Sequence, residues 1–186
     1  ISDWRARFSG GEFPFLYVQL ANYGKPMAKP VEDGIMMTVR EAQVQNLSVK
    51  NTGMAVAIEN AGDQPTNIHP KNKQAIGYRL GLIARAKVYG EKVEYSGPMY
   101  KSYKVKGNTI ELSFDHVGKG LVLKNDDING FAICGPDKNW FYARAVIKGK
   151  KIIVSSPEVA NPVAVRYCWG TNPPASLSNK AGLWAP

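Results

Sequence analysis

The chain has 186 residues, of which 44% are hydrophobic and 10% aromatic, and its formal net charge is +9. This composition excludes an intrinsically disordered chain, and no apolar run reaches the ~18–20 residues that a membrane-spanning helix needs. The lysines are spread along the sequence and no nucleic-acid-binding signature accompanies them. We therefore expect a solvated basic surface, with neither a nucleic acid nor a membrane as partner.

The first half of the sequence alternates strand-like and helix-like segments. The nearly continuous apolar run 13–23 predicts a strand buried on both faces, and 54–60 predicts a second one. Between them, residues 35–46 have the spacing of a helix, with Ile35 and Val39 on its apolar stripe. Strands that alternate with helices predict an α/β layer with a parallel sheet.

The second half contains short β-type runs separated by turn residues such as Lys-Gly-Asn, Asn-Gly and Gly-Pro-Asp. The runs are 109–114, 120–124, 130–135, 140–149, 151–156 and 164–169. Short strands at this spacing predict an antiparallel β-sandwich. The expected fold class is thus α/β plus β, with one unit at 1–90 and a second at 91–186.

His69 stands directly before Pro70, where a second helix is predicted to begin because proline suits a first helical turn. If strand 54–60 is parallel to its neighbour, the ring lies at the carboxyl edge of the sheet, where α/β active sites gather. Imidazole exchanges protons near neutral pH, so His69 is a candidate general base; a capping or surface histidine is the alternative. An orienting carboxylate could come from Asp63, but the first half offers no serine in a nucleophile-like context.

Seven segments carry a family resemblance that covers essentially the whole chain. They are DWRARF, FPFLYVQLANY, VREAQ, NTGMAVAIEN, NIHPKNKQAIGYRLGLIARAKVYG, FDHVGKGL and NPVAVRYCWGTNPPASLSNKAGLWA. On these segments the chain resembles the C-terminal portion of bacterial sialate O-acetylesterases, and it is similar to related carbohydrate acetylesterases of the SGNH hydrolase superfamily. The resemblance implies part of an SGNH-type, flavodoxin-like α/β/α domain followed by a β-sandwich.

The resemblance also implies an activity: hydrolysis of O-acetyl esters on sugars through a serine acyl-enzyme, without a metal or organic cofactor. The expected substrate is 9-O-acetyl sialic acid, with acetylated xylan as an alternative. A periplasmic or secreted location is implied as well. A non-catalytic carbohydrate-binding module that uses the second half is the alternative function from a different class.

Within the resemblance, His69 matches the family's catalytic histidine. The serine and the glycine and asparagine of the oxyanion hole are expected before Ile1, so the N-terminal half of the same enzyme is the expected partner. Thr66 and Asn67 stand where such enzymes often carry the catalytic aspartate. The acid is therefore Asp63 or a backbone carbonyl, unless the site is a Ser–His dyad.

Three polar residues of the first half are candidates for substrate binding. Arg40 can hold a sugar carboxylate bidentately, although a packing or surface role is the alternative. Gln19 and Asn22 end the first strand and could face the cleft, or they could make structural hydrogen bonds in the loop.

Other residues of the second half have a structural and a functional interpretation. His116 is expected in a turn or an inter-domain hydrogen bond, with a second catalytic histidine as the alternative. Four aromatic residues could form a sugar-stacking platform, or could lie in the core: Trp140, Tyr142, Tyr167 and Trp169. Cys134 and Cys168 lack metal-ligand spacing and are either buried free thiols or one disulfide.

Overall fold

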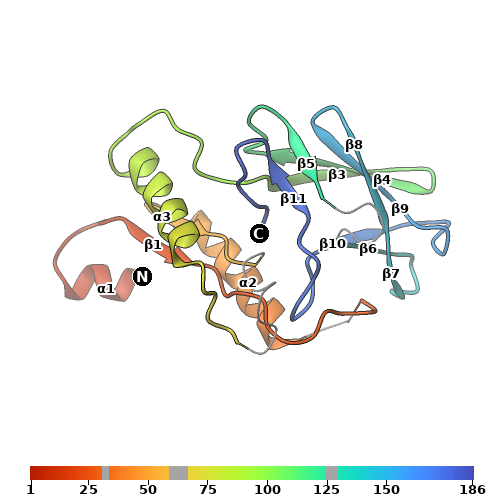
Figure 1. Ribbon diagram of the computed structural model, residues 1–186, viewed down its shortest axis with the longest axis horizontal. Coiled ribbons are helices and arrows are strands. Elements are labelled where there is room, and N and C mark those ends of the chain that lie inside the picture. The colour runs from red at the N-terminus through yellow and green to blue at the C-terminus, as the bar shows by residue number, and fades with distance from the viewer. Residues whose placement is uncertain (31–33, 59–66, 125–129) are drawn as a thin grey trace.

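The computed structural model describes residues 1–30, 34–58, 67–124 and 130–186. Helices and one pair of parallel strands form the first half, and antiparallel sheets form the second (Figure 1). The first half contains α1 (Ser2–Arg7), β1 (Phe15–Val18), α2 (Ile35–Gln45), the 3₁₀ helix η1 (Asn46–Ser48), β2 (Thr52–Ala55) and α3 (Lys73–Lys87).

Strands β1 and β2 are parallel, with Phe15 opposite Thr52 and Val18 opposite Ala55. β2 is buried along its whole length, whereas β1 is half-buried and ends on the exposed Val18, so the prediction that the run 13–23 forms a strand buried on both faces is wrong. Helix α3 packs closely on this pair because Gly53 has no side chain: a Cβ there would collide with Ile83 of α3. The parallel arrangement predicted for the first half is confirmed. β1 covers only part of the run 13–23, and β2 begins at Thr52, before the run 54–60, whose last two residues lie outside the described residues.

Helix α2 buries a different face from the one its sequence predicts. Ile35 is 81% exposed and Val39 is 41% exposed, whereas Met37 and Arg40 are buried. The buried face is the one from which the Arg40 side chain donates to the carbonyl of Gly170, so contact with the C-terminal segment sets the orientation of this helix.

Helix α3 begins at Lys73, and the prediction of a start at or just after His69 is wrong. The side chain of Asn72 caps the helix by accepting a hydrogen bond of 3.0 Å from the N–H of Ala75. Asparagine is a stronger N-cap than histidine, so the chain between His69 and Asn72 stays outside the helix.

The second half consists of short strands in three antiparallel sheets among the described residues, with strand orders β3-β4-β9-β8, β10-β6-β7 and β11-β5. The strands are β3 (Met99–Lys106), β4 (Thr109–Asp115), β5 (Leu121–Leu123), β6 (Phe131–Cys134), β7 (Trp140–Tyr142), β8 (Arg144–Lys148), β9 (Lys151–Ser155), β10 (Ala164–Tyr167) and β11 (Leu177–Asn179). One apolar core joins the sheets, with Ile110, Phe131, Ile133, Ile152 and Leu177 at most 1% exposed.

Sequence patterns predicted most of these strands but missed β3 and β11. β3 is rich in lysine and pairs on one side only, which removes the apolar alternation of a half-buried strand. The predicted single run 140–149 is two strands, because the buried Ala143 separates β7 in one sheet from β8 in another.

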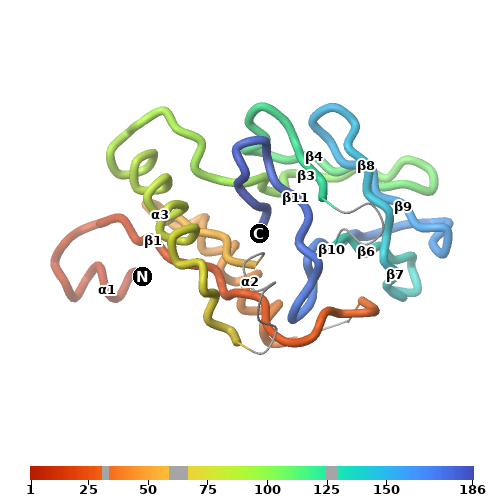
Figure 2. The backbone as a smooth tube through the Cα atoms, in the orientation of Figure 1, coloured from red at the N-terminus to blue at the C-terminus, as the bar shows by residue number. Residues whose placement is uncertain are grey.

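The C-terminal segment holds the two halves together. Cys168 packs with Met54, Val56 and Ile58 in a second apolar cluster. Figure 2 shows the C-terminus in the middle of the molecule, between the helices of the first half and the antiparallel sheets. Both cysteines are buried free thiols, so of the two alternatives for Cys134 and Cys168 the disulfide is wrong.

Candidate functional site

His69 lies on the exposed segment that leads from β2 into α3, and its ring is held by Asn67. The Oδ1 atom of Asn67 accepts a hydrogen bond of 2.9 Å from the backbone N–H of His69 and lies 3.0 Å from Nδ1 of the same residue. In Figure 1 this segment lies on the same side of the parallel pair as the chain that follows β1. That side is the carboxyl edge of the two strands.

The contact with Asn67 determines which nitrogen of the ring can act as a base. A backbone N–H can only donate, so the Asn67 atom that binds it is the carbonyl oxygen and not the amide nitrogen. The same oxygen can accept from Nδ1 only when Nδ1 carries the proton. Nε2 of the neutral ring is then unprotonated and free to accept a proton, which is the tautomer that a general base requires.

Asp63 and Thr66 lie outside the described residues, so the role predicted for Asp63 stays a prediction. Asn67 is the ring's partner that the structure does place.

The three predicted substrate-binding residues lie together, below the surface. Gln19 is 2% exposed and Asn22 and Arg40 are each 4% exposed. Asn22 donates from Nδ2 to Oδ1 of Asn172 at 2.6 Å, and Arg40 donates from Nη2 to the carbonyl of Gly170. These contacts join the first half to the C-terminal segment, while a direct role with substrate stays a prediction.

Sequence reasoning missed Asn172 and Gly170, and no local pattern could have found them. They lie 150 and 130 residues from the side chains that they bind, so only the folded chain brings them together.

Two of these buried groups have unused hydrogen-bonding capacity. Among the described residues, Nη1 of Arg40 and Oε1 of Gln19 have no hydrogen-bond partner. Both side chains line a cavity of about 50 Å³ beside Cys168 and Trp169. Burial lowers the pKa of Arg40, because the surroundings disfavour its charge. A buried donor and a buried acceptor beside a cavity are typical of a place where a polar ligand or water binds.

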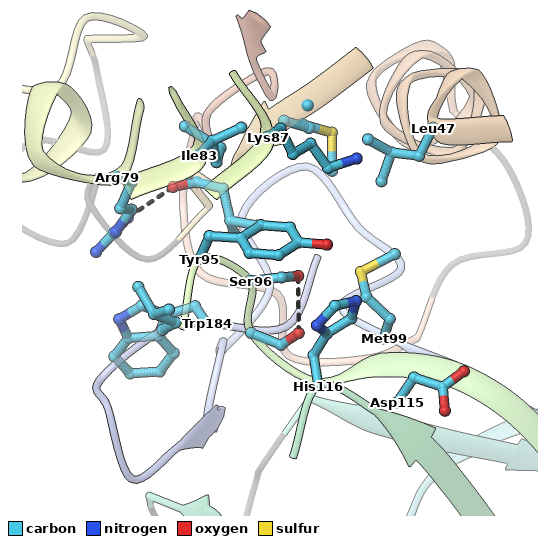
Figure 3. A pocket seen from close by; sticks show the side chains of 16 residues that line it. Leu47, Arg79, Ile83, Lys87, Tyr95, Ser96, Met99, Asp115, His116 and Trp184 are labelled. Carbon is cyan, nitrogen blue, oxygen red and sulfur yellow. Dashed lines mark hydrogen bonds between the residues drawn. The ribbon is translucent and has the colours of Figure 1, made fainter. Parts of the chain in front are cut away.

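His116 belongs to a second pocket, of about 250 Å³, which Gly53, Met54 and Ala55 of β2 also line (Figure 3). Its ring meets that of Tyr95 edge-on at 5.2 Å between centroids, and its carbonyl accepts from Nδ2 of the buried Asn179 at 3.1 Å. Nζ of Lys87 lies 5.6 Å from the centroid of the Tyr95 ring and donates to the carbonyl of Thr52. A turn or an inter-domain hydrogen bond was expected for His116; the residue directly precedes the turn that the N–H of Gly120 closes on the carbonyl of Val117, and its own hydrogen bond comes from Asn179 of the same half.

The four aromatic residues considered as a platform divide into two groups. Tyr142 and Tyr167 have structural roles: the Tyr142 hydroxyl donates to the carbonyl of Met27 at 3.0 Å, and the Tyr167 hydroxyl accepts from the N–H groups of two residues of the C-terminal segment. Trp140 and Trp169 lie on the guanidinium of Arg166, with ring centroids at 4.0 and 5.0 Å from its Cζ.

The described part of the chain holds no group of three or more His, Cys, Asp or Glu side chains that could bind a metal ion. None of its helices has the length and apolar character needed to cross a membrane.

No protein-family model matches the chain. The sialate O-acetylesterase of Mus musculus is 33% identical over 196 residues and that of Homo sapiens is 31% identical over 193, in each case over 93% of this chain. The chain is a homologue of the sialate O-acetylesterases. The relationship predicted from the seven segments is therefore confirmed.

A solved structure extends this relationship to the fold. The crystal structure of a carbohydrate acetylesterase from Xanthomonas citri superimposes with a TM-score of 0.88 and 41% identity, over 98% of this chain and 42% of that one. The chain spans about a third of the length of its curated relatives, 35% of the mouse protein and 36% of the human one.

Proposed function

We propose that this chain is part of a carbohydrate esterase that removes O-acetyl groups from sugars, with His69 as its general base. The observation that carries the proposal is the hydrogen-bonded pair of Asn67 and His69 at the carboxyl edge of a parallel strand pair. The homology to sialate O-acetylesterases and the likeness to a carbohydrate acetylesterase support it.

In the proposed reaction, Nε2 of His69 takes the proton of a serine hydroxyl as the serine oxygen bonds to the acetyl carbonyl carbon. The tetrahedral intermediate collapses when the sugar oxygen leaves and takes the proton from the imidazolium. Water then attacks the acetyl-enzyme, losing a proton to Nε2, and the serine oxygen recovers that proton as acetic acid leaves. The net change is an acetyl ester and water converted to a sugar hydroxyl and acetic acid.

The proposal also covers the nucleophile, the oxyanion hole, the domains and the substrate of the whole enzyme. The serine and the oxyanion hole would come from an N-terminal half of the same enzyme, completing an SGNH-type α/β/α domain on the pair β1–β2. The antiparallel sheets would form its β-sandwich. The proposed substrate is 9-O-acetyl sialic acid, because the sequence relatives are named for sialate; acetylated xylan is the competing substrate.

The test is ester hydrolysis by the full-length protein, with 9-O-acetyl sialic acid, acetylated xylan and p-nitrophenyl acetate as substrates. His69→Ala should lower kcat by at least roughly 10³-fold, because base and nucleophile act as one unit. His116→Asn is the matched control: asparagine tolerates the positive φ of 56° at this position, and activity should be retained. Equal activity of His69→Ala and wild type would overturn the proposal.

The loss of kcat in variants of Asn67 and of Asp63 shows which of the two residues orients the ring of His69. If Asn67 orients the ring, Asn67→Ala removes its contact with the backbone N–H and also the neutral hydrogen bond to the ring. The bond to the ring is worth about 0.5–1.5 kcal/mol, which corresponds to about a two- to tenfold loss of kcat. If Asp63 is the orienting carboxylate, Asp63→Asn should approach the ~10⁴-fold loss seen when a triad carboxylate becomes an amide, and Asn67→Ala should have almost no effect.

A further inference from the structure

An irregularity in strand β3 turns two tyrosines toward the same side of the sheet. Tyr100 lies opposite Phe114 and Tyr103 lies opposite Leu112, with a shift of register between Tyr100 and Ser102. Phe114 and Leu112 are two residues apart on β4 and therefore share a face. Tyr100 and Tyr103 share it too, although they are three residues apart, because the extra residue between them re-aims one side chain.

These tyrosines form the lip of a groove made of two adjoining hollows. The hollows have volumes of about 460 and 230 Å³, and both are lined by Tyr100, Leu112 and Val165. Tyr100 is 60% exposed and Tyr103 is 53% exposed, so their rings are open to a ligand. Three residues of extended chain span about 10 Å, which separates the two rings enough to contact successive units of a chain molecule.

The inner end of the groove reaches the candidate functional site. The larger hollow and the small cavity beside Arg40 and Gln19 share Glu41, Val44, Tyr167, Trp169 and Pro186 as lining residues. Gln19 directly follows β1 and continues its ladder by donating to the carbonyl of Ala55 at 2.9 Å. The groove therefore leads from the edge of the antiparallel sheet to the carboxyl edge of the parallel pair.

The polar groups along the groove are few and fixed in place. The guanidinium of Arg166 lies against both Trp140 and Trp169, which holds its plane in one orientation. Glu41 also lines the larger hollow and supplies a carboxylate there. Aromatic faces with a few placed donors and acceptors suit a sugar, whose ring has an apolar face and whose hydroxyls need hydrogen-bond partners.

We propose that this groove binds an oligosaccharide chain, so that the enzyme acts on acetyl groups carried by a chain of sugars. A sugar at the inner end would bring its polar groups to the unused Nη1 of Arg40 and Oε1 of Gln19. Only the placement of the acetylated sugar rests on the proposed function; binding of the chain does not. A polypeptide strand is disfavoured as the occupant because Lys101, Lys104 and Lys106 stand along the open edge of β3.

The test is calorimetric binding to the full-length protein. The probes are xylo-oligosaccharides and sialyl oligosaccharides, each compared with its free monosaccharide. At least one oligosaccharide should bind more tightly than its monosaccharide. Tyr100→Ala and Tyr103→Ala should each weaken that binding about five- to tenfold, whereas Tyr103→Phe should retain most of it because the stacking face remains. Tyr78→Ala is the matched control, since Tyr78 is 65% exposed on α3, away from the groove.

The outcomes separate this inference from the proposed function. Equal binding by wild type and both alanine variants would overturn the proposal that the groove binds an oligosaccharide. Binding of no oligosaccharide would overturn it as well, and is the result expected if another part of the full-length protein covers the groove. Hydrolysis of an acetylated monosaccharide by the same preparation would leave the esterase proposal standing in that case. Oligosaccharide binding that depends on Tyr100 and Tyr103, without any ester hydrolysis, would support oligosaccharide binding in the groove and overturn the proposed esterase function.

Discussion

Replacing Arg40 by methionine tests whether this buried arginine is kept for function or for stability. The guanidinium is 4% exposed, donates to the carbonyl of Gly170 and leaves Nη1 without a partner among the described residues. Among the described residues no carboxylate forms an ion pair with it, and burial lowers its pKa. The buried charge of Arg40 therefore destabilises the folded state.

The expected change in stability follows from two opposing effects. Arg40→Met loses one hydrogen bond from a charged donor, about 1.5–3 kcal/mol. It also removes the desolvation penalty of a buried ion, which is several kcal/mol, and methionine fills most of the volume of the arginine stem. We therefore expect the free energy of unfolding to stay within about 2 kcal/mol of wild type or to rise, while activity on acetylated sugars falls.

The assay is urea unfolding of the full-length protein beside ester hydrolysis. Arg79→Met is the matched control, since Arg79 is also buried and donates to a backbone carbonyl, that of Val56 at 2.6 Å. This variant should lose at least the roughly 1.5–3 kcal/mol of one hydrogen bond from a charged donor. A loss of about 3–5 kcal/mol in Arg40→Met would refute the reasoning, because that is the cost of breaking a buried ion pair and would mean that a carboxylate elsewhere meets Nη1.

Two further predictions concern titration in the second half. Hydrogen bonds from Lys151 and Lys106 lower the pKa of Glu111 to about 2. The stabilisation that Glu111 provides is therefore complete above the ordinary carboxyl value of ~4.3 and is lost as the pH falls from there toward the folded-state value. Urea midpoints of Glu111→Gln should lie below those of wild type near neutral pH and converge with them in acid; a constant gap would contradict this. Burial raises the pKa of Cys168 to about 12 and raises that of Cys134, so neither thiol should react with a disulfide reagent faster than the protein unfolds.

The sequence was informative where local chemistry decides the structure. The apolar run 54–60 predicted a strand buried on both faces, and the two residues of that run that lie in β2, Met54 and Ala55, are buried. Histidine followed by proline after that strand predicted a ring at the carboxyl edge, and the Asn67 side chain that holds it was visible two residues away. Such features depend on a few neighbouring residues, which the sequence displays directly.

The sequence did not predict features that depend on contacts between distant segments of the chain. On α2 the apolar stripe of Ile35 and Val39 predicted the buried face, yet the helix turns Arg40 inward because Gly170 offers a carbonyl there. β3 was missed because it is an edge strand with exposed lysines and lacks the apolar alternation that predicts a strand. The groove depends on a single register shift between two strands, and the same residues without that shift would place Tyr100 and Tyr103 on opposite faces.

The arrangement of the two halves explains why the polar residues of the first half are buried. β1 and β2 form a pair that is too small to be stable alone, and the C-terminal segment covers them through Cys168 and Trp184. The same segment carries Gly170 and Asn172, which bind Arg40 and Asn22. The second half covers these groups when the chain folds. The carboxyl edge on which His69 lies and the proposed oligosaccharide groove are therefore two ends of one interface between the halves. A sugar chain held by the antiparallel sheet would then be presented to the edge on which His69 lies.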